Sequence, residues 1–182
     1  SFLKDRLKEL GADHISEDQS AEITGSQSGN LIANFRGKAT DEKAVFFICH
    51  MDTVEPGCGV EVERAEDLFT SRGDTILGGD DKSGIAALLE VLQIIRENTI
   101  NYRPFQLVLT TCEEIGLLGA KALEHEHIHA EFGYALDSTG IDRVVIGAPA
   151  SNRLKITIHG VAAHAGLHPE QGVSAIGLAA KS

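Results

Sequence analysis

The sequence predicts an α/β fold with a mixed, largely parallel central sheet that is flanked by helices. Apolar segments of strand length alternate along the chain with helical segments, which is the pattern of a sheet built from strand–helix–strand units. The segments at 43–49 and 105–112 are almost entirely apolar, as in strands buried on both faces. With 182 residues, the chain is long enough for one domain, or for one domain and part of another.

The expected elements follow one another in order. Residues 1–10 predict a charged amphipathic helix, and residues 84–96 predict a strong helix because apolar side chains recur three and four positions apart. The other elements are shorter and rest on apolar segments. They are strands at 30–36, 43–49, 105–112, 132–136 and 143–146, and a short helix at 117–123.

The pattern of polar and apolar residues changes near Pro149. Residues 153–159 alternate between polar and apolar side chains, which indicates a half-exposed strand, and a helical pattern runs from near Gly172 to Ser182. We expect that a chain ending inside an apolar helix has been cut. The sequence therefore predicts one domain at residues 1–148 and the truncated beginning of a second at 149–182.

The composition excludes several kinds of partner. A formal net charge of −11 argues against nucleic acid and anionic membranes, and no apolar run approaches the roughly 18 residues that cross a bilayer. The N-terminal segment lacks the apolar core of a signal peptide. Three cysteines without CxxC spacing fit a reducing compartment, so we expect a cytoplasmic protein.

A histidine and an aspartate stand where the first buried strand is expected to end. His50 and Asp52 are two positions apart, so on extended backbone they face the same way. The carboxyl end of a sheet strand is where α/β proteins build sites, and Asp52 could orient a metal-binding His50 through its other ring nitrogen. Taken alone, the pair also fits a loop histidine with an acidic neighbour by chance.

Two acidic pairs each have a structural and a functional interpretation. Asp80 and Asp81 precede the strong helix, where carboxylates cap helices or bind a metal, and their segment lacks the spacing of a phosphate-binding loop. Glu113 and Glu114 end the second buried strand. There, one could bind a metal while the other takes the proton of a metal-bound water, although paired glutamates at the beginning of a helix are also common surface residues.

Asp137 and His164 complete the set of candidates. Asp137 follows a short apolar segment, where an aspartate is also a frequent turn former or cap. His164 lies among small residues and could donate a hydrogen bond to developing negative charge, or be an exposed structural histidine. The histidines at 125–129 have polar neighbours and are interpreted as a solvated face. Histidine and carboxylates recurring at strand ends indicate zinc or a similar divalent ion.

Taken in order, the segments HMDTV, GGDDKSG, TCEEIG, LDSTG and GVAAHAG resemble the dinuclear zinc exopeptidase and aminoacylase family, most closely its peptidase T-like (tripeptidase) branch. The resemblance covers nearly the whole chain. It implies a zinc exopeptidase catalytic domain at 1–148 and the start of an α+β lid or dimerisation domain at 149–182. A homodimer formed through that lid is a candidate assembly.

The resemblance also implies a role for each site residue. Asp52 would orient the histidine ligand, Glu113 would be the general base, and His164 would stabilise the tetrahedral intermediate. Two zinc ions are implied, with Co²⁺ or Mn²⁺ as substitutes, and a cis peptide bond is expected after the bridging aspartate. The implied metal ligands are His50, Asp80 (the bridge), Glu114 and Asp137.

The implied function is hydrolysis of short peptides by a water that two zinc ions and Glu113 activate. The family normally supplies a last histidine ligand from a segment after the lid, which these residues lack, so we expect weak or no turnover from them alone. An N-acyl amino acid amidohydrolase of the same family shares the metal residues and is the nearest alternative. A non-catalytic metal- or peptide-binding relative is the other, and an intact Glu113 disfavours it.

Overall fold

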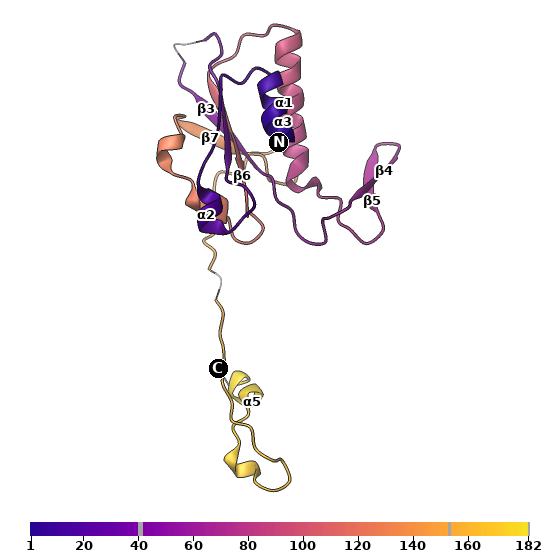
Figure 1. The fold of residues 1–182 in the computed structure, drawn as a ribbon, viewed down its shortest axis with the longest axis vertical. Coiled ribbons are helices and arrows are strands. Elements are labelled where there is room, and N and C mark those ends of the chain that lie inside the picture. The colour runs from indigo at the N-terminus through magenta and orange to yellow at the C-terminus, as the bar shows by residue number, and fades with distance from the viewer. Residues whose placement is uncertain (40–41, 153, 182) are drawn as a thin grey trace. The chain divides into compact units, whose positions relative to one another are not determined.

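A computed structural model describes residues 1–39, 42–152 and 154–181 (Figure 1). The chain divides into two compact units, Ser1–Thr139 and Gly140–Ser182. The first unit contains a five-stranded sheet with the strand order β1-β2-β6-β3-β7, and a two-stranded sheet of β4 and β5. None of the helices in the described residues has the length and apolar character needed to cross a membrane.

The five-stranded sheet is mixed. Its strands are β1 (His14–Glu17), β2 (Leu31–Phe35), β6 (Phe105–Thr110), β3 (Val45–His50) and β7 (Phe132–Ala135). The pairs β1–β2 and β2–β6 are antiparallel, whereas β6–β3 and β3–β7 are parallel. The predicted α/β class is confirmed, and the parallel part consists of the strands that lead to the candidate residues.

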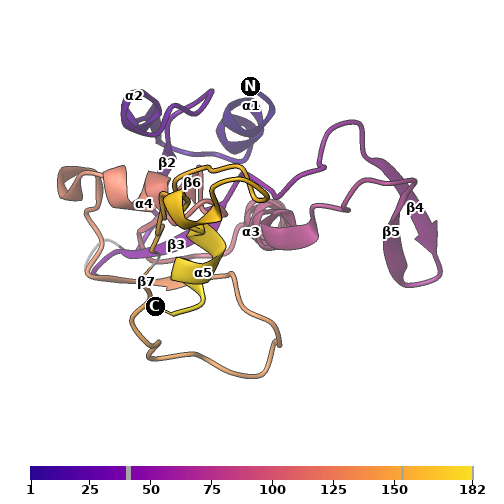
Figure 2. The same ribbon diagram turned by 90° about the horizontal axis from the view of Figure 1, so that it is seen from below.

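Helices cover both faces of this sheet (Figure 2). Helices α1 (Phe2–Glu9) and α3 (Gly79–Glu97) lie on one face, and α2 (Ser20–Thr24) and α4 (Leu118–Ala122) lie together on the other. The core joins apolar side chains of α1 and α3 to those of the strands, and each fully buried large side chain contributes about 1.5–3 kcal/mol. It includes Leu7, Leu10, Leu31, Phe35, Ile85, Leu88, Leu92, Leu107 and Leu109.

The sequence did not predict several polar or exposed elements. These are β1, α2, the short 3-10 helix η1 (His125–His127), and the hairpin of β4 (Glu61–Ala65) and β5 (Leu68–Arg72). All of β4 and four of the five residues of β5 are exposed. Such a hairpin has no buried face to produce an alternating pattern.

The second unit contains the 3-10 helix η2 (Pro169–Gln171) and the helix α5 (Ala175–Ala179). The helix predicted to run from Gly172 to Ser182 is therefore shorter, and Ser182 itself lies outside the described residues. The strand predicted at 143–146 is wrong, and 154–159 of the strand predicted at 153–159 are not strand either; residue 153 is outside the described residues. A strand needs a partner, and the described part of this unit has only the isolated bridge between Val161 and Val173.

Candidate metal centre

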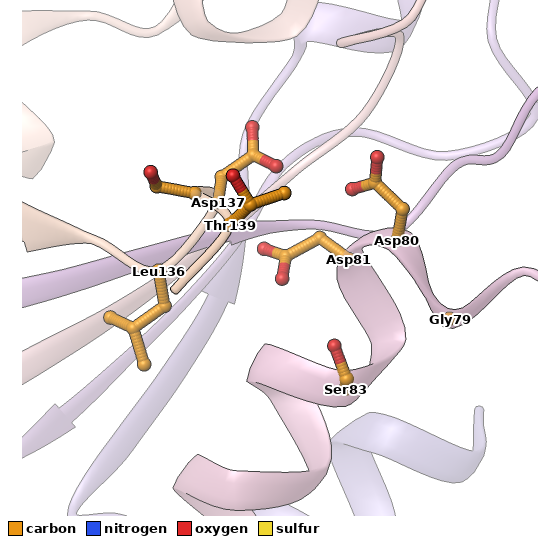
Figure 3. A pocket seen from close by; sticks show the side chains of 8 residues that line it. Gly79, Asp80, Asp81, Ser83, Leu136, Asp137 and Thr139 are labelled. Carbon is orange, nitrogen blue, oxygen red and sulfur yellow. The ribbon is translucent and has the colours of Figure 1, made fainter. Parts of the chain in front are cut away.

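The candidate residues of the first unit come from four segments that meet where the parallel strands end. His50 is the last residue of β3, and the register pairs it with Thr110 at the end of β6. The segments after β6 and β7 carry the glutamates and Asp137. Figure 3 shows Asp80, Asp81 and Asp137 around a hollow of about 320 Å³ between the start of α3 and the segment after β7.

His50 is at the centre of this arrangement, with only 2% of its surface exposed. Its Nδ1 lies 2.9 Å from the backbone carbonyl oxygen of Asp52. A carbonyl only accepts, so this hydrogen bond assigns the proton to Nδ1 and leaves the Nε2 lone pair of the neutral ring for a metal. Nε2 lies 3.0 Å from Asp80 Oδ1 and 3.8 Å from Asp137 Oδ1. The Glu113 carboxylate is 4.0 Å away.

Asp52 contacts the site through both its backbone carbonyl and its side-chain carboxylate. Its backbone carbonyl holds His50, while its carboxylate is 3.7 Å from the same ring. The carboxylate accepts hydrogen bonds from the backbone N–H groups of Glu113, at 3.0 Å, and Glu114, at 3.2 Å. Asp52 therefore joins the end of β3 to the main chain of the two glutamates, a contact that the sequence did not predict.

The aspartate pair places its two side chains differently. The Asp80–Asp81 peptide bond is cis, as the resemblance predicted. The Asp80 side chain is 72% exposed toward the hollow, whereas Asp81 is 3% exposed and its Oδ2 accepts from the His50 backbone N–H at 3.3 Å. Both aspartates have non-helical backbone dihedral angles, so α3 is kinked at the aspartate pair and continues as a regular helix after Asp81. The close approach of Asp81 requires Gly84, since a Cβ there would overlap Asp81 Oδ1.

The donor atoms fit a divalent metal. Two overlapping groups, His50 with Asp81 and Asp137, and His50 with Asp80 and Glu114, each place one ligand atom per residue within 4.8 Å of the others. Zinc binds neutral imidazole nitrogen and carboxylate oxygen. Burial, opposed by His50 and reinforced by the neighbouring Asp80 and Asp81, raises the pKa of Asp137 to about 6. The repulsion among these carboxylates is what a bound cation would relieve.

We expect the contribution of Asp137 to the stability of the metal-free protein to fall as the pH rises from about 4 to 7. The raised pKa of Asp137, from 3.8 to about 6, means that the folded state holds its proton more tightly. That stabilisation is complete below pH 3.8 and is lost as the pH rises through 6. Burial lowers the pKa of His50, but the contacts with Asp80 and Asp52 outweigh it, so the net pKa lies above 6.5 and its contribution is lost above that pH.

Thermal unfolding in EDTA between pH 4 and 8 measures this dependence. In the Asp137→Asn variant, the part of the change in melting temperature between pH 4 and 6 that comes from Asp137 should be absent. The difference between the two proteins therefore measures this one carboxyl group, separately from general acid unfolding. With zinc present, stability should instead increase with pH over this range, because the ligands bind the metal in their deprotonated forms. Parallel profiles of the wild type and the variant would contradict the assignment.

The remaining histidines are placed elsewhere. His164 belongs to the second unit, where its exposed ring accepts a hydrogen bond at Nδ1 from the Gly166 backbone N–H at 3.2 Å. It is therefore not among the residues that the first unit brings together, and its predicted role stays a prediction. His125 and His129 are exposed, as expected of a solvated face, and neither belongs to a candidate metal group in the described residues.

Comparison with known proteins defines the class first. The sequence model of peptidase family M28 matches residues 30–166, so the chain belongs to this family. The relatives then identify the branch. Peptidase T of Salmonella schwarzengrund is 28% identical over 99% of this chain and 50% of its own length, and the uncharacterized protein YqjE of Bacillus subtilis is 42% identical over 99% of this chain and 48% of its own length.

Solved structures of peptidases support the same assignment. Aminopeptidase PepT from Bacillus cereus matches with a TM-score of 0.76 and 36% identity, and a tripeptidase from Staphylococcus aureus with a TM-score of 0.79 and 35% identity. Each match covers 99% of this chain and 48% of the other. The predicted resemblance to peptidase T-like zinc exopeptidases is confirmed. The chain spans about half the length of these relatives.

Proposed function

We propose that the protein containing this chain is a metal-dependent peptidase that hydrolyses short peptides, as a tripeptidase or aminopeptidase does. One observation supports this most: the Nε2 of a buried imidazole faces the carboxylates of Asp80 and Asp137, which come from two other segments, and a third carboxylate, that of Glu113, lies 4.0 Å from the same nitrogen. The relatives named peptidase T, PepT and tripeptidase support a peptide as the substrate.

In the proposed reaction, residues of the chain would bind a metal that activates a water molecule, and would transfer the proton. The ligands would be His50, Asp80, Glu114 and Asp137, with two zinc ions, or Co²⁺ or Mn²⁺, as the metal. When bound, the metal lowers the pKa of a water and polarises the substrate carbonyl. Glu113 takes the proton of that water and then donates it to the leaving amine. Asp52 keeps Glu113 in place through its main chain.

Other parts of the proposal rest on the sequence. We propose that His164 stabilises the negative charge that develops on the attacked carbonyl oxygen. We also propose that residues 149–182 open a lid or dimerisation domain, through which two copies pair. The cytoplasmic location belongs to the same set of predictions.

A substrate panel tests the function. The full-length protein, loaded with zinc, is expected to release amino-terminal residues from tripeptides faster than it hydrolyses N-acyl amino acids, and EDTA should reduce both rates to background. Amine release followed for both substrate sets gives the comparison. Hydrolysis of N-acyl amino acids alone would identify an amidohydrolase instead, and zinc binding without turnover of any substrate would identify a binding protein.

A further inference from the structure

Asn30 is a completely buried polar residue outside the predicted site, with 0% of its surface exposed. It immediately precedes β2, on the far side of β6 from His50. Its backbone N–H is directed to Asp18 Oδ1, at 2.8 Å, and to Ser20 Oγ, at 2.9 Å. Burying an amide lowers the stability of the fold unless its polar atoms are hydrogen-bonded. The hydrogen bonds of the Asn30 side chain therefore indicate its structural role.

The side-chain amide of Asn30 contacts both ends of one segment. Its Oδ1 accepts from the Thr111 backbone N–H at 3.1 Å, and its Nδ2 donates to the Gly119 carbonyl oxygen at 2.9 Å. The second hydrogen of Nδ2 is directed to Asp18 Oδ2 at 2.7 Å. Burial raises the pKa of Asp18, but the hydrogen bonds from Ser20 and Asn30 together outweigh it and lower the net pKa. The acceptor is therefore charged, which strengthens the bond from Asn30.

The segment between these two ends, Thr111–Gly119, carries both glutamates of the site. It closes on itself, because the Gly119 N–H donates to the Thr111 carbonyl at 3.0 Å and the Leu118 N–H donates to the Cys112 carbonyl at 2.9 Å. The closure is tight, since a Cβ on Gly119 would overlap the Thr111 carbonyl oxygen. Asn30 therefore ties together the two ends of a closed loop.

We propose that Asn30 is a positioning residue that fixes both ends of the Thr111–Gly119 loop and thereby aims Glu113 and Glu114 at the metal centre. Asp52 holds the middle of the same loop through the two glutamate N–H groups. The loop is thus anchored from β3 by Asp52 and from the start of β2 by Asn30. The catalytic part of the proposal rests on the proposed function, but the anchoring of the loop does not.

Only an amide provides what this position requires. Two donors and an acceptor are used at once by Gly119, Asp18 and Thr111, and neither aspartate nor leucine, which are similar in size, has that combination. Replacing a residue that hydrogen-bonds a metal ligand typically costs about 10–100-fold in metal affinity or activity, and we expect a loss of that order when the loop that carries Glu113 and Glu114 is displaced. A displacement of the loop would therefore be seen in catalysis and in zinc binding, not only in stability.

The first test compares Asn30→Leu with Thr111→Val in the full-length protein. The Thr111 hydroxyl is buried beside Asn30 and has no hydrogen-bond partner among the described residues. A valine at this position therefore keeps all the hydrogen bonds that Asn30 makes with Thr111, Gly119 and Asp18. Asn30→Leu should lower kcat by about 10–100-fold with KM little changed, and weaken zinc affinity measured by calorimetry. It should also speed amide exchange of the loop N–H groups. Thr111→Val should leave all three as in the wild type.

A second pair of variants separates stability from positioning. In Asn30→Asp, a carboxylate faces both Asp18 and the Gly119 carbonyl. Adding Asp18→Asn restores the bond between the two side chains with donor and acceptor exchanged, while Gly119 stays without a donor. We expect the double variant to recover part of the melting temperature that Asn30→Asp loses, because the Gly119 carbonyl stays unpaired, but to recover neither zinc affinity nor kcat. This comparison tests the positioning role if Asn30→Leu does not fold.

Several outcomes would overturn the proposal. One is an Asn30→Leu protein that melts at a lower temperature but matches Thr111→Val in zinc affinity, loop exchange and kcat. Another is a double variant in which stability and kcat recover together, because a purely structural role predicts that result. If the wild type hydrolyses no peptide, the proposed function fails, and zinc affinity and loop exchange still test the anchoring by Asn30.

Discussion

Replacing Glu113 by glutamine is expected to abolish peptide hydrolysis and to leave zinc bound. Positioned general bases contribute about 10²–10⁴-fold to the rate, so kcat should fall by that factor. Glutamine has the same shape but cannot take a proton. The substitution also keeps the main-chain N–H that Asp52 holds at 3.0 Å, so the loop should stay in place and the loss should come from the missing base.

Zinc content and kcat must be measured on the same preparation. Glu90→Gln, an exposed glutamate on α3, is the matched control because it makes the same chemical change on the surface. It should keep both zinc and turnover. A Glu113→Gln protein that hydrolyses tripeptides at the wild-type rate would contradict the proposed mechanism. One that has lost zinc would instead identify Glu113 as a ligand.

The sequence predicted the fold best where burial is strong. Strands β3 and β6 are found within two residues of their predicted limits, and helix α3 is found where it was predicted but begins five residues earlier, at Gly79 instead of 84. A segment buried on one or both faces must show it in the spacing of its apolar residues. The hairpin of β4 and β5 is exposed and shows no such pattern. Residues 143–146 have the apolar composition of a strand, but Val144 is 71% and Ile146 97% exposed, so the composition indicated burial that these residues do not have.

Candidate site residues could be predicted for a topological reason. The carboxyl ends of parallel strands share one edge of the sheet, so residues that directly follow β3, β6 and β7 are brought together whatever the details of packing. The structure places His50, Glu113 and Asp137 at that edge. Their chemical roles remain predictions.

The contacts that support these residues could not be predicted from spacing. The bond from Asn30 to Gly119 joins residues 89 positions apart, and the bonds from Asp52 to the glutamate N–H groups join segments about 60 apart. Such bonds depend on distances between strands and loops that no local pattern encodes. The sequence placed Asn30 only as the first residue of the strand predicted at 30–36, and nothing in that position indicated what its side chain would contact.

Replacing His50 by alanine is expected to remove zinc from the protein. His50 belongs to both candidate ligand groups, and its Nε2 is the nitrogen that the surrounding carboxylates share. Loss of the ligand itself should cost more than the 10–100-fold reduction in affinity that loss of a ligand's supporting partner costs. The remaining carboxylates would also lose the imidazole that offsets their repulsion, so the metal-free variant should be less stable at neutral pH.

Thermal unfolding with and without zinc shows the loss directly. At a zinc concentration 100 times its Kd, the wild type should gain about 2.7 kcal/mol of stability, and a variant that binds 100 times more weakly should gain only about 0.4 kcal/mol. His125→Ala is the matched control, because His125 is exposed in η1 and belongs to neither ligand group. It should keep the full gain. A His50→Ala protein that keeps both zinc and the stability gain would show that the metal binds elsewhere, and the assignment of Asp80, Glu114 and Asp137 as ligands would fail with it.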